Sequence, residues 1–372
     1  MKLFFVVGET SGDALAADAL TAVRMAVPDV AAVGLAGSRL QAAGIDSLFD
    51  IAELSVMGIS AVLGRLPQLV RRVYQTVDAV EAERPDVLVL VDSPDFTHAV
   101  AKRVRKRMPN LPIIDYVCPS VWAWRQDRAR EMAAFIDHVL AILPFEPKLL
   151  TELGGPPATY VGHPLGLVEE PEQVAPTTIP TLLVLPGSRT SEISRLLPIF
   201  EATLTLLQER GNAFTARVPA VPHLRRNVER AVAGWPVDVD VVGGSEETRF
   251  RDASCALAAS GTVSLELAMH GVPMVLAYKL DPLASRLRSM IKTWSVALPN
   301  HVADRVVVPE NVEEYAKPAR LARQVEDLLQ DTAQRRAQVE GLARVRQMVR
   351  VERPPAEAAA EILIRYARHG RN

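Results

Sequence analysis

The chain has few cysteines, almost no net charge and no long apolar run, and each shortage excludes a class of protein. Its only cysteines, Cys118 and Cys255, lie inside apolar runs and lack the short spacing of a metal or redox pair. We expect two buried, reduced thiols. The 42 Lys and Arg residues nearly balance the 44 Asp and Glu residues, so the net charge does not predict a nucleic-acid partner. No apolar run approaches the roughly 20 residues of a membrane-spanning helix, so any membrane contact should be peripheral.

Signatures of common nucleotide enzymes and of metal sites are missing as well. The chain contains neither G-x-x-x-x-G-K-[ST] nor G-x-G-x-x-G, which disfavours ATP hydrolysis and NAD chemistry. Its seven histidines lack the spacing of metal ligands. His163 could contact a ligand at the domain junction, but a structural hydrogen bond explains it at least as well. Asp238 and Asp240 have a spacing with which some sugar transferases hold a cation. Alternation along a strand explains this pair better, so we predict no metal site.

The chain does contain a regular alternation of short apolar runs and helical-period segments, which is typical of parallel sheets flanked by helices. We expect strands at 3–7, 30–35, 87–91, 113–118, 139–143 and 159–161, and again at 181–185, 213–218, 239–242, 256–259 and 274–278. This pattern predicts an α/β protein with two Rossmann-like, doubly wound domains. Such sheets place their ligands at the carboxyl ends of the strands, so we expect the domains to face a shared cleft.

Composition also predicts the domain boundaries. Residues 1–165 form the first domain, and a proline-rich stretch without a clear period at 166–180 reads as the linker. Residues 181–345 form the second domain. The chain ends in a helical segment, 346–372, which packs either on the first domain or on a partner subunit.

Two turns of the first domain carry candidate chemistry. The stretch "GETSGD" (residues 8–13) follows the first strand and is either a tight turn before a capped helix or a site for a sugar or phosphate. In "VDSPDF" (residues 91–96), Asp95 has the position of a helix N-cap, which is its preferred interpretation. Asp92 stands at the end of the strand and lacks that structural explanation. It is therefore the better candidate for a general base.

Two turns of the second domain suit an anion. In "LPGSRTSEI", Ser188 or Thr190 can cap a helix while Arg189 grips a phosphate, although an exposed pair between Arg189 and Glu192 is an equally good interpretation. In "ASGTVSLE", the turn opens a helix whose first turn contains an acid able to read two ribose hydroxyls. A dipole-favoured acid is the alternative for that residue. The turn comprises Ser260, Gly261, Thr262 and Glu266. Together the turns predict a nucleoside diphosphate.

An apolar stripe at 56–73 is the remaining candidate. Packing into the core is its usual explanation, but arginines beside it would also suit an anionic membrane surface. The residues that we assign to a membrane-facing surface are Val56, Met57, Ile59, Val62 and Leu63.

These motifs resemble the lipid-A-disaccharide synthase family. The stretches "GETSGD", "LSVMGISAVLGRLP", "VDSPDF", "PSVWAWR", "ILPFEP", "VGHPL", "LPGSR", "ASGTVSLELAMHGVPMVLAY" and "LPN" occur in the family's order over roughly residues 3 to 310. The chain departs from the family pattern after Asn300.

The resemblance implies the GT-B glycosyltransferase fold and an inverting transfer that needs no metal and no cofactor. The donor would be UDP-2,3-diacylglucosamine, the acceptor 2,3-diacylglucosamine 1-phosphate, and the product a β-1,6-linked lipid A disaccharide with UDP. It also implies a cytoplasmic protein that is peripheral on the inner membrane, and it leaves a homodimer with exchanged C-terminal helices open.

The resemblance also assigns roles to residues. Asp92 resembles the general base, and Arg189 resembles the residue that steadies the diphosphate. The nucleotide-sugar side would include Gly187, Ser188, Ser260, Gly261, Thr262, Glu266 and Asn300. The acceptor side would include Glu9, Ser11, Gly12 and Asp13.

Other functions use the same turns. A UDP-sugar epimerase or a transferase with a soluble acceptor would share the nucleotide turns but would not need an exposed apolar helix. A non-catalytic nucleotide-sugar binding protein would not need Asp92 as a base.

Overall fold

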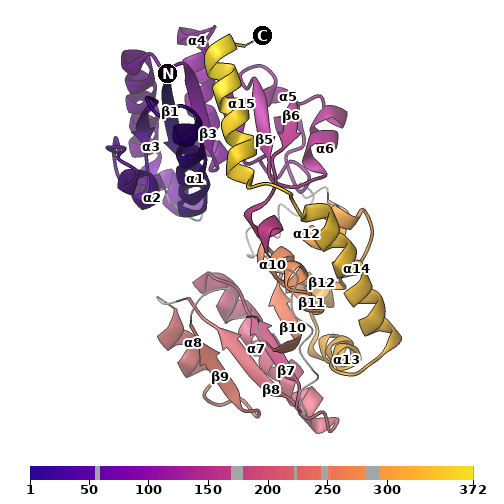
Figure 1. The fold of residues 1–372 in the computed structure, drawn as a ribbon. Coiled ribbons are helices and arrows are strands. Elements are labelled where there is room, and N and C mark those ends of the chain that lie inside the picture. The colour runs from indigo at the N-terminus through magenta and orange to yellow at the C-terminus, as the bar shows by residue number, and fades with distance from the viewer. Residues whose placement is uncertain are drawn as a thin grey trace. The chain divides into compact units, whose positions relative to one another are not determined.

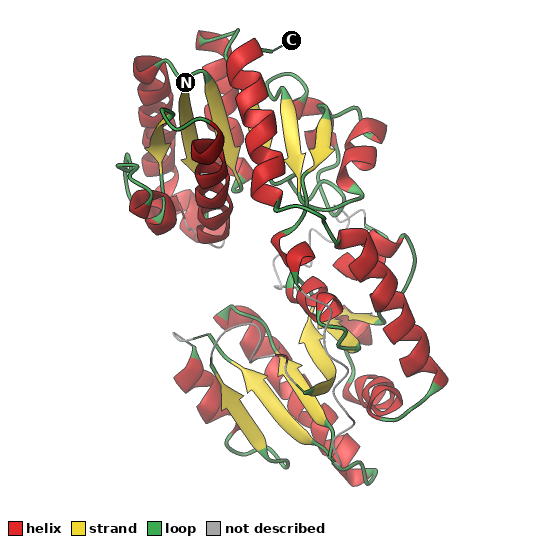
Figure 2. Ribbon diagram, in the orientation of Figure 1, coloured by secondary structure: helices red, strands yellow, loops and turns green. Residues whose placement is uncertain are grey.

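A computed structural model of the chain describes residues 1–54, 59–168, 179–221, 224–243, 250, 252–280 and 293–371, with the backbone alone for 59–63. It divides into two compact units, Met1–Pro164 with Val351–Asn372, and Leu165–Arg350. Each unit is a parallel sheet flanked by helices (Figures 1 and 2). Most of the predicted linker, residues 169–178, lies outside the described residues.

The first unit is a six-stranded sheet in the order β2-β1-β3-β4-β5-β6, and each neighbouring pair is parallel. Its strands are β1 (Lys2–Val7), β2 (Ala31–Leu35), β3 (Val87–Val91), β4 (Ile113–Tyr116), β5 (His138–Ala141) and β6 (Ala158–Tyr160). Its helices are α1 (Thr10–Ala26), α2 (Ser38–Ala42), α3 (Ile59–Glu83), α4 (Pro94–Arg107), α5 (Asp127–Met132), α6 (Glu146–Glu152) and α15 (Pro355–His369), with the 3-10 turn η1 (Ile51–Leu54). The 3-10 turn η2 (Pro164–Leu167) contains the boundary between the first and the second unit.

The second unit is a six-stranded parallel sheet in the order β12-β11-β10-β7-β8-β9. Its strands are β7 (Thr181–Leu185), β8 (Thr215–Pro219), β9 (Val239–Val242), β10 (Ala253–Ala259), β11 (Met274–Tyr278) and β12 (Glu310–Val312). Its helices are α7 (Thr190–Glu209), α8 (Arg225–Val232), α10 (Val263–Met269), α12 (Leu298–Ala303), α13 (Pro318–Leu329) and α14 (Ala333–Val349), with the 3-10 turn η4 (Glu313–Tyr315).

The predicted fold class is confirmed, because both sheets are parallel and reverse their strand order at a central strand. All eleven predicted strands form, with ends displaced by a few residues. The sequence analysis missed β12, whose residues Glu310, Asn311 and Val312 do not form an apolar run. Helix α1 starts at Thr10, inside the "GETSGD" stretch.

Strand β1 shows why the sheet of the first unit is apolar on both faces. Successive side chains of a strand point to opposite faces. Leu3, Phe5 and Val7 pack with α1 and α15, whereas Phe4 and Val6 pack with the opposite cluster, which includes α3 and α4. A continuous apolar run is therefore the expected sequence of this strand.

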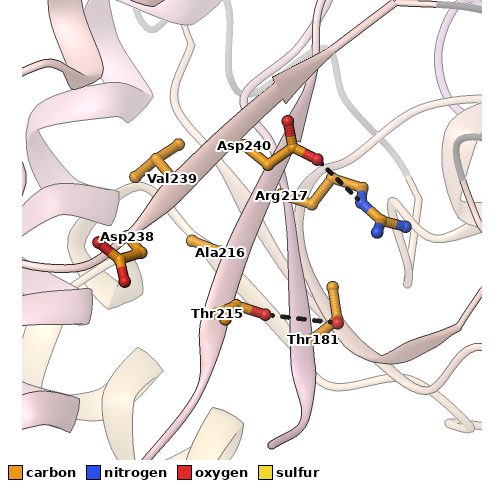
Figure 3. Close-up of a pocket in the computed structure, with 7 residues that line it drawn as sticks. All are labelled: Thr181, Thr215, Ala216, Arg217, Asp238, Val239 and Asp240. Carbon is orange, nitrogen blue, oxygen red and sulfur yellow. Dashed lines mark hydrogen bonds and ion pairs between the residues drawn. The ribbon is translucent and has the colours of Figure 1, made fainter.

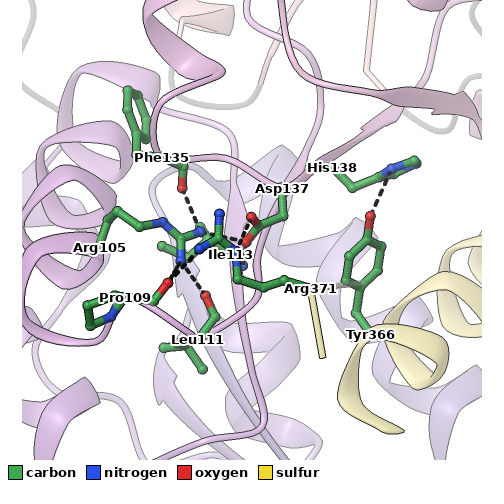
Figure 4. A network of polar contacts seen from close by, with 9 residues as sticks. All are labelled: Arg105, Pro109, Leu111, Ile113, Phe135, Asp137, His138, Tyr366 and Arg371. Atoms are coloured by element: carbon green, nitrogen blue, oxygen red, sulfur yellow. Dashed lines mark hydrogen bonds and ion pairs between the residues drawn. The ribbon is translucent and has the colours of Figure 1, made fainter. Parts of the chain in front are cut away.

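The C-terminal helix α15 completes the first unit of its own chain and packs along α1 (Figure 1). Beyond its apolar face, polar contacts fix its end. The buried Asp137 carboxylate accepts from Arg105 Nη2 at 2.5 Å and from Arg371 Nε at 2.7 Å (Figure 4). Tyr366 Oη lies 3.3 Å from Nδ1 of His138, whose pKa burial lowers to about 4. In this structure the terminal helix is therefore an element of the first unit, and the unit boundary falls at Arg350.

Candidate active site

The turns after β1 and β3 interlock at the point where the strand order of the first sheet reverses. Val7 is paired with Val91 in the sheet register, which sets Gly8 beside Asp92. Gly8 N donates to Val91 O at 3.2 Å. A Cβ atom on Gly8 would lie 2.1 Å from Cβ of Ser93, so only glycine fits there. The geometry joins two turns that are 80 residues apart in the sequence.

Asp92 is half-buried at the carboxyl end of β3, and hydrogen bonds fix its side chain. Its Oδ1 accepts from Ser93 N at 2.8 Å, and its Oδ2 accepts from the Ser11 hydroxyl at 3.2 Å. Both Asp92 and Ser93 have positive φ, 61° and 46°, a conformation that side chains adopt rarely. Within the described residues no cation pairs with Asp92. The carboxylate is thus held at the sheet edge without a role in the core.

The four predicted acceptor-side residues separate into two groups. Glu9 and Ser11 are exposed, and Ser11 contacts Asp92. Gly12 is buried, and a Cβ atom on it would lie 3.1 Å from Cβ of Asp92.

Asp13 does not line the sheet edge. Its carboxylate is fully buried and accepts from the backbone N–H groups of Gly37 at 2.9 Å, Arg39 at 2.7 Å and Leu40 at 3.3 Å. It therefore satisfies N–H groups at the start of α2, and its predicted contact with a ligand stays a prediction.

Asp95 is not the N-cap that the sequence predicted. The N-cap of α4 is Ser93, whose side chain makes no capping bond, and Asp95 lies in the first helical turn. Its Oδ1 instead accepts from Arg125 Nη1 at 3.3 Å and from Arg128 Nη2. The Asp95 carboxylate therefore pairs with arginines that are distant in the sequence and does not cap the helix.

The two predicted nucleotide turns of the second unit are also neighbours. Leu185 is paired with Ala258 in the sheet register, so the turn after β7 lies beside the turn after β10. The strand order reverses between these strands, which is where doubly wound sheets bind their ligands. Gly187 has φ 112° and Gly261 has φ 158°, which favours glycine at both positions.

Arg189 adopts the exposed pair that the sequence had left open. Its Nη1 lies 3.0 Å from Oε1 of Glu192, and its side chain is 56% exposed. Neither Ser188 nor Thr190 is the N-cap of α7. That residue is Arg189, without a side-chain capping bond. A hydroxyl cap therefore does not occupy the start of α7, and an anion could accept from the N–H groups there.

Ser260 anchors the loop before α12, and Asn300 bonds to the loop after that helix. The Ser260 hydroxyl donates to Val296 O at 2.6 Å. Asn300 is fully buried, and its Oδ1 accepts from Val307 N at 2.7 Å and from Val308 N at 2.8 Å. These bonds give Asn300 a structural role in the loop, and its predicted ligand contact stays a prediction.

The sequence analysis missed one partner of the loop before α12. Glu310 accepts from Val296 N at 2.6 Å and from the Ser295 hydroxyl at 2.9 Å. Thr262 is exposed, and Glu266 is half-buried one helical turn further on. The first turn of α10 therefore contains the predicted acid, Glu266, and follows the exposed hydroxyl of Thr262 at the sheet edge.

A pocket of the second unit lies at the opposite, amino edge of the sheet and contains none of the predicted site residues (Figure 3). It is lined by Thr181, Thr215, Ala216, Arg217, Asp238, Val239 and Asp240. Asp240 Oδ2 lies 3.8 Å from Arg217 Nε, which agrees with a structural role for this acid. Over the ranges that the structure describes, no group of three His, Cys, Asp or Glu side chains could hold a metal ion.

The remaining predicted residues are buried or fall outside the description. Both cysteines are buried as predicted, and burial raises the pKa of Cys255 to about 12. Burial lowers the pKa of His163 to about 4. Val56 and Met57 lie outside the described residues, as do the side chains of Ile59, Val62 and Leu63. Among the described residues, no helix is both long and apolar enough to cross a membrane.

Solved structures with a similar fold support the architecture. The glycotransferase of kitacinnamycin superposes with a TM-score of 0.65 at 16% identity and covers 98% of each chain. A UDP-GlcNAc 2-epimerase from Neisseria meningitidis bound to UDP-GlcNAc superposes with a TM-score of 0.59 at 12% identity, again over 98% of each chain. At these identities the likeness shows the fold alone, which is the GT-B arrangement of two Rossmann-like domains.

Sequence relatives are closer. A lipid-A-disaccharide synthase of Bradyrhizobium diazoefficiens is 44% identical and covers 100% of this chain and 97% of the relative. A lipid-A-disaccharide synthase of Nitrobacter winogradskyi is 46% identical, and the match covers 100% of this chain and 96% of the relative. The family model described as lipid-A-disaccharide synthetase matches residues 3–363. The chain therefore belongs to the lipid-A-disaccharide synthetase family.

Proposed function

We propose that this protein transfers 2,3-diacylglucosamine from UDP to 2,3-diacylglucosamine 1-phosphate and so forms the β-1,6-linked lipid A disaccharide. Family membership supports the reaction, and the position of Asp92 is the structural observation that carries it. This carboxylate is aligned by Ser11 and the Ser93 amide at the edge where such sheets bind ligands, and within the described residues no cation neutralises it.

The proposed mechanism is a direct displacement with inversion. The 6-hydroxyl oxygen of the acceptor forms a bond to the anomeric carbon of the donor while the bond from that carbon to the UDP oxygen breaks. Asp92 takes the proton of the hydroxyl as general base. The diphosphate leaves with the bonding electrons, and Arg189 together with backbone N–H groups at the start of α7 stabilises its charge without a metal ion.

For Arg189 to serve in this way, it must exchange Glu192 for the diphosphate. Its side chain is exposed and its pair with Glu192 is a surface pair, which contributes about 1 kcal/mol or less. A diphosphate offers more charge and a bidentate partner, so the exchange is favourable.

Replacing the base tests the mechanism. Asp92→Asn should lower disaccharide formation about 10²- to 10⁴-fold, because the amide cannot accept the proton. Asp78→Asn is the matched control, since Asp78 is an exposed aspartate that pairs with Arg107 on the surface. Turnover should be measured as UDP release and as disaccharide formed. Unchanged turnover in Asp92→Asn would remove the assignment.

We also propose that the protein acts at the cytoplasmic face of the inner membrane, where acylated substrates reside. On helix α3, Leu66, Val70 and Tyr74 are 48%, 42% and 45% exposed and recur every four residues, which places them on one face of the helix. The exposed arginines Arg65 and Arg71 flank this stripe. Apolar side chains beside cations suit an anionic bilayer surface.

Vesicle binding tests this surface. The wild-type protein should sediment with vesicles that contain phosphatidylglycerol, and a Leu66→Glu, Val70→Glu variant should sediment much less, since charge opposes insertion of the stripe. Val339→Glu, at an exposed valine of α14, is the control and should bind like the wild type. Equal binding by all three proteins would argue for a soluble acceptor.

A further inference from the structure

A basic and aromatic cluster lies beside the first turn of α4, and the proposed mechanism does not use it. We call it the Trp124 cluster; it consists of Asp95, Trp124, Arg125 and Arg128. The guanidinium carbons of Arg125 and Arg128 lie 5.6 and 5.8 Å from the centre of the Trp124 ring. Both arginines bond to the same oxygen, Oδ1 of Asp95. Two cations thus share a single carboxylate oxygen.

A neighbouring ion pair adds no net charge to the Trp124 cluster. Lys102 and Glu131 are adjacent and pair with each other at 3.1 Å, so together they add no net charge. The ammonium of Lys102, followed by Arg125 and Arg128 among other charges, lowers the pKa of Glu131. The Trp124 cluster therefore has one positive charge more than its acids neutralise.

The cluster is next to the proposed base. The N–H of Asp92 donates to Tyr116 O at 3.3 Å, and Tyr116 ends the strand from which the loop to Arg125 departs. Asp95 follows Asp92 by three residues, so their Cα atoms are at most about 11 Å apart. That span is about the reach of a hexose that carries a phosphate at one end and a hydroxyl at the other.

The loop that carries the arginines is held in an unusual conformation. Val117 has φ 81° and Arg125 has φ 50°, and a left-handed conformation is a real outlier for a β-branched residue such as valine. Such conformations persist where the surrounding structure holds them, and they gather at ligand sites. Arg128 is in addition 9% exposed, so a nearly buried cation faces the exposed carboxylate of Asp95.

We propose that Arg125 and Arg128 bind the phosphate monoester of the acceptor sugar, with the Trp124 ring against the sugar itself. This inference rests on the proposed function, because it assigns the acceptor's phosphate to the site that contains Asp92. The phosphate takes the place of Asp95 as the partner of the two guanidinium groups. Arginine suits this task because its fork of N–H groups matches two phosphate oxygens.

The test compares two acceptors in nonionic detergent, one with the 1-phosphate and one from which it has been removed. The wild type should prefer the phosphorylated acceptor in kcat/KM by about 10- to 100-fold, as charge-assisted hydrogen bonds allow. Arg125→Gln should reduce this preference at least several-fold, because kcat/KM should fall more for the phosphorylated acceptor than for the dephosphorylated one. Arg107→Gln is the control, because Arg107 is on α4 but pairs with Asp78 and Glu81 instead.

Asp95→Asn gives a result of opposite sign. It removes the competitor of the phosphate, so KM for the phosphorylated acceptor should fall and the preference should rise. If Asp95 only braces the loop, both acceptors should be used less well. A preference that is unchanged in Arg125→Gln, or an equal loss with both acceptors, would overturn the inference.

Two further outcomes are separable. A wild-type protein that transfers the donor sugar to neither acceptor would contradict the proposed function itself. A lipid headgroup also carries phosphate, so Arg125→Gln is tested on phosphatidylglycerol vesicles, where it should sediment like the wild type. Loss of vesicle binding with an unchanged acceptor preference would assign the arginines to the membrane and overturn the inference.

Discussion

At the scale of single residues, the structure distinguishes acids that the sequence presents alike. Asp13, Asp92 and Asp95 all follow strands in short polar turns. Asp13 is buried against the amides of α2 and Asp95 is bound by two arginines, whereas among the described residues Asp92 accepts only from neutral donors. The position of Asp92 at the sheet edge was predicted correctly, because it follows from the end of the apolar run 87–91 and needs only local sequence.

The other two acids could not be placed from the sequence. The partners of Asp13 are 24 to 27 residues away, and those of Asp95 are 30 and 33 residues away. Contacts over such separations depend on how elements pack, and local preference does not reveal them. Asn300 illustrates a related limit, since an asparagine near a ligand turn looks the same in the sequence whether it contacts the ligand or supports the loop.

Gly8 provides a residue-scale prediction. Gly8→Ala would place a Cβ atom 2.1 Å from Cβ of Ser93, so the turn must move and take Asp92 with it. We expect a loss of stability of about 1–3 kcal/mol and a loss of activity larger than the loss of folded protein. Gly234→Ala, at an exposed glycine with open space around it, is the control and should change neither. Thermal unfolding and the disaccharide assay measure both effects, and a fully active Gly8→Ala would show that the interlock does not position the base.

At the scale of elements, buried polar groups at strand ends set the loops. Glu146 opens α6 after β5 and is 2% exposed, and burial raises its pKa to about 8 despite hydrogen bonds from the Leu143 and Ile142 amides. The neutral carboxyl is therefore the favoured form in the folded protein. In the unfolded chain the same group titrates near its ordinary pKa.

The sign of the pH dependence follows from this difference. Between about pH 4.5 and 8 the folded state binds more protons than the unfolded state, so Glu146 reduces stability as the pH rises through that window. Each pKa unit corresponds to about 1.4 kcal/mol. Glu146→Gln should remove this dependence and melt higher than the wild type at pH 8, with little difference near pH 4.5. Thermal unfolding across the window checks it, and parallel curves for both proteins would contradict it.

Elements also show the limits of sequence periodicity. The stripe on α3 was treated as one face, yet Val73 is buried in the core whereas Leu66 and Val70 are exposed. A helix of this length packs one side against the core and exposes the other side to solvent, and apolar residues occur on both sides of α3. Which valine faces the core depends on the sheet beneath the helix.

At the scale of the whole molecule, two sheets each bring a pair of turns together at the reversal of strand order. In the first unit these turns carry Ser11 and Asp92, and in the second they carry Arg189 and Ser260. The sequence predicted this architecture almost completely, because buried parallel strands are short apolar runs. It left open whether the last helix packs on its own chain. In the structure α15 packs on α1, where Leu363 and Ile362 join the core of the first unit.

The reaction itself is the most direct test of the account. Purified protein should be incubated with UDP-2,3-diacylglucosamine and 2,3-diacylglucosamine 1-phosphate, and the product analysed by mass spectrometry and by NMR of the new linkage. We predict one UDP released for each disaccharide formed, with a β-1,6 bond and the phosphate retained. Release of UDP without a disaccharide, or an α linkage, would contradict the account.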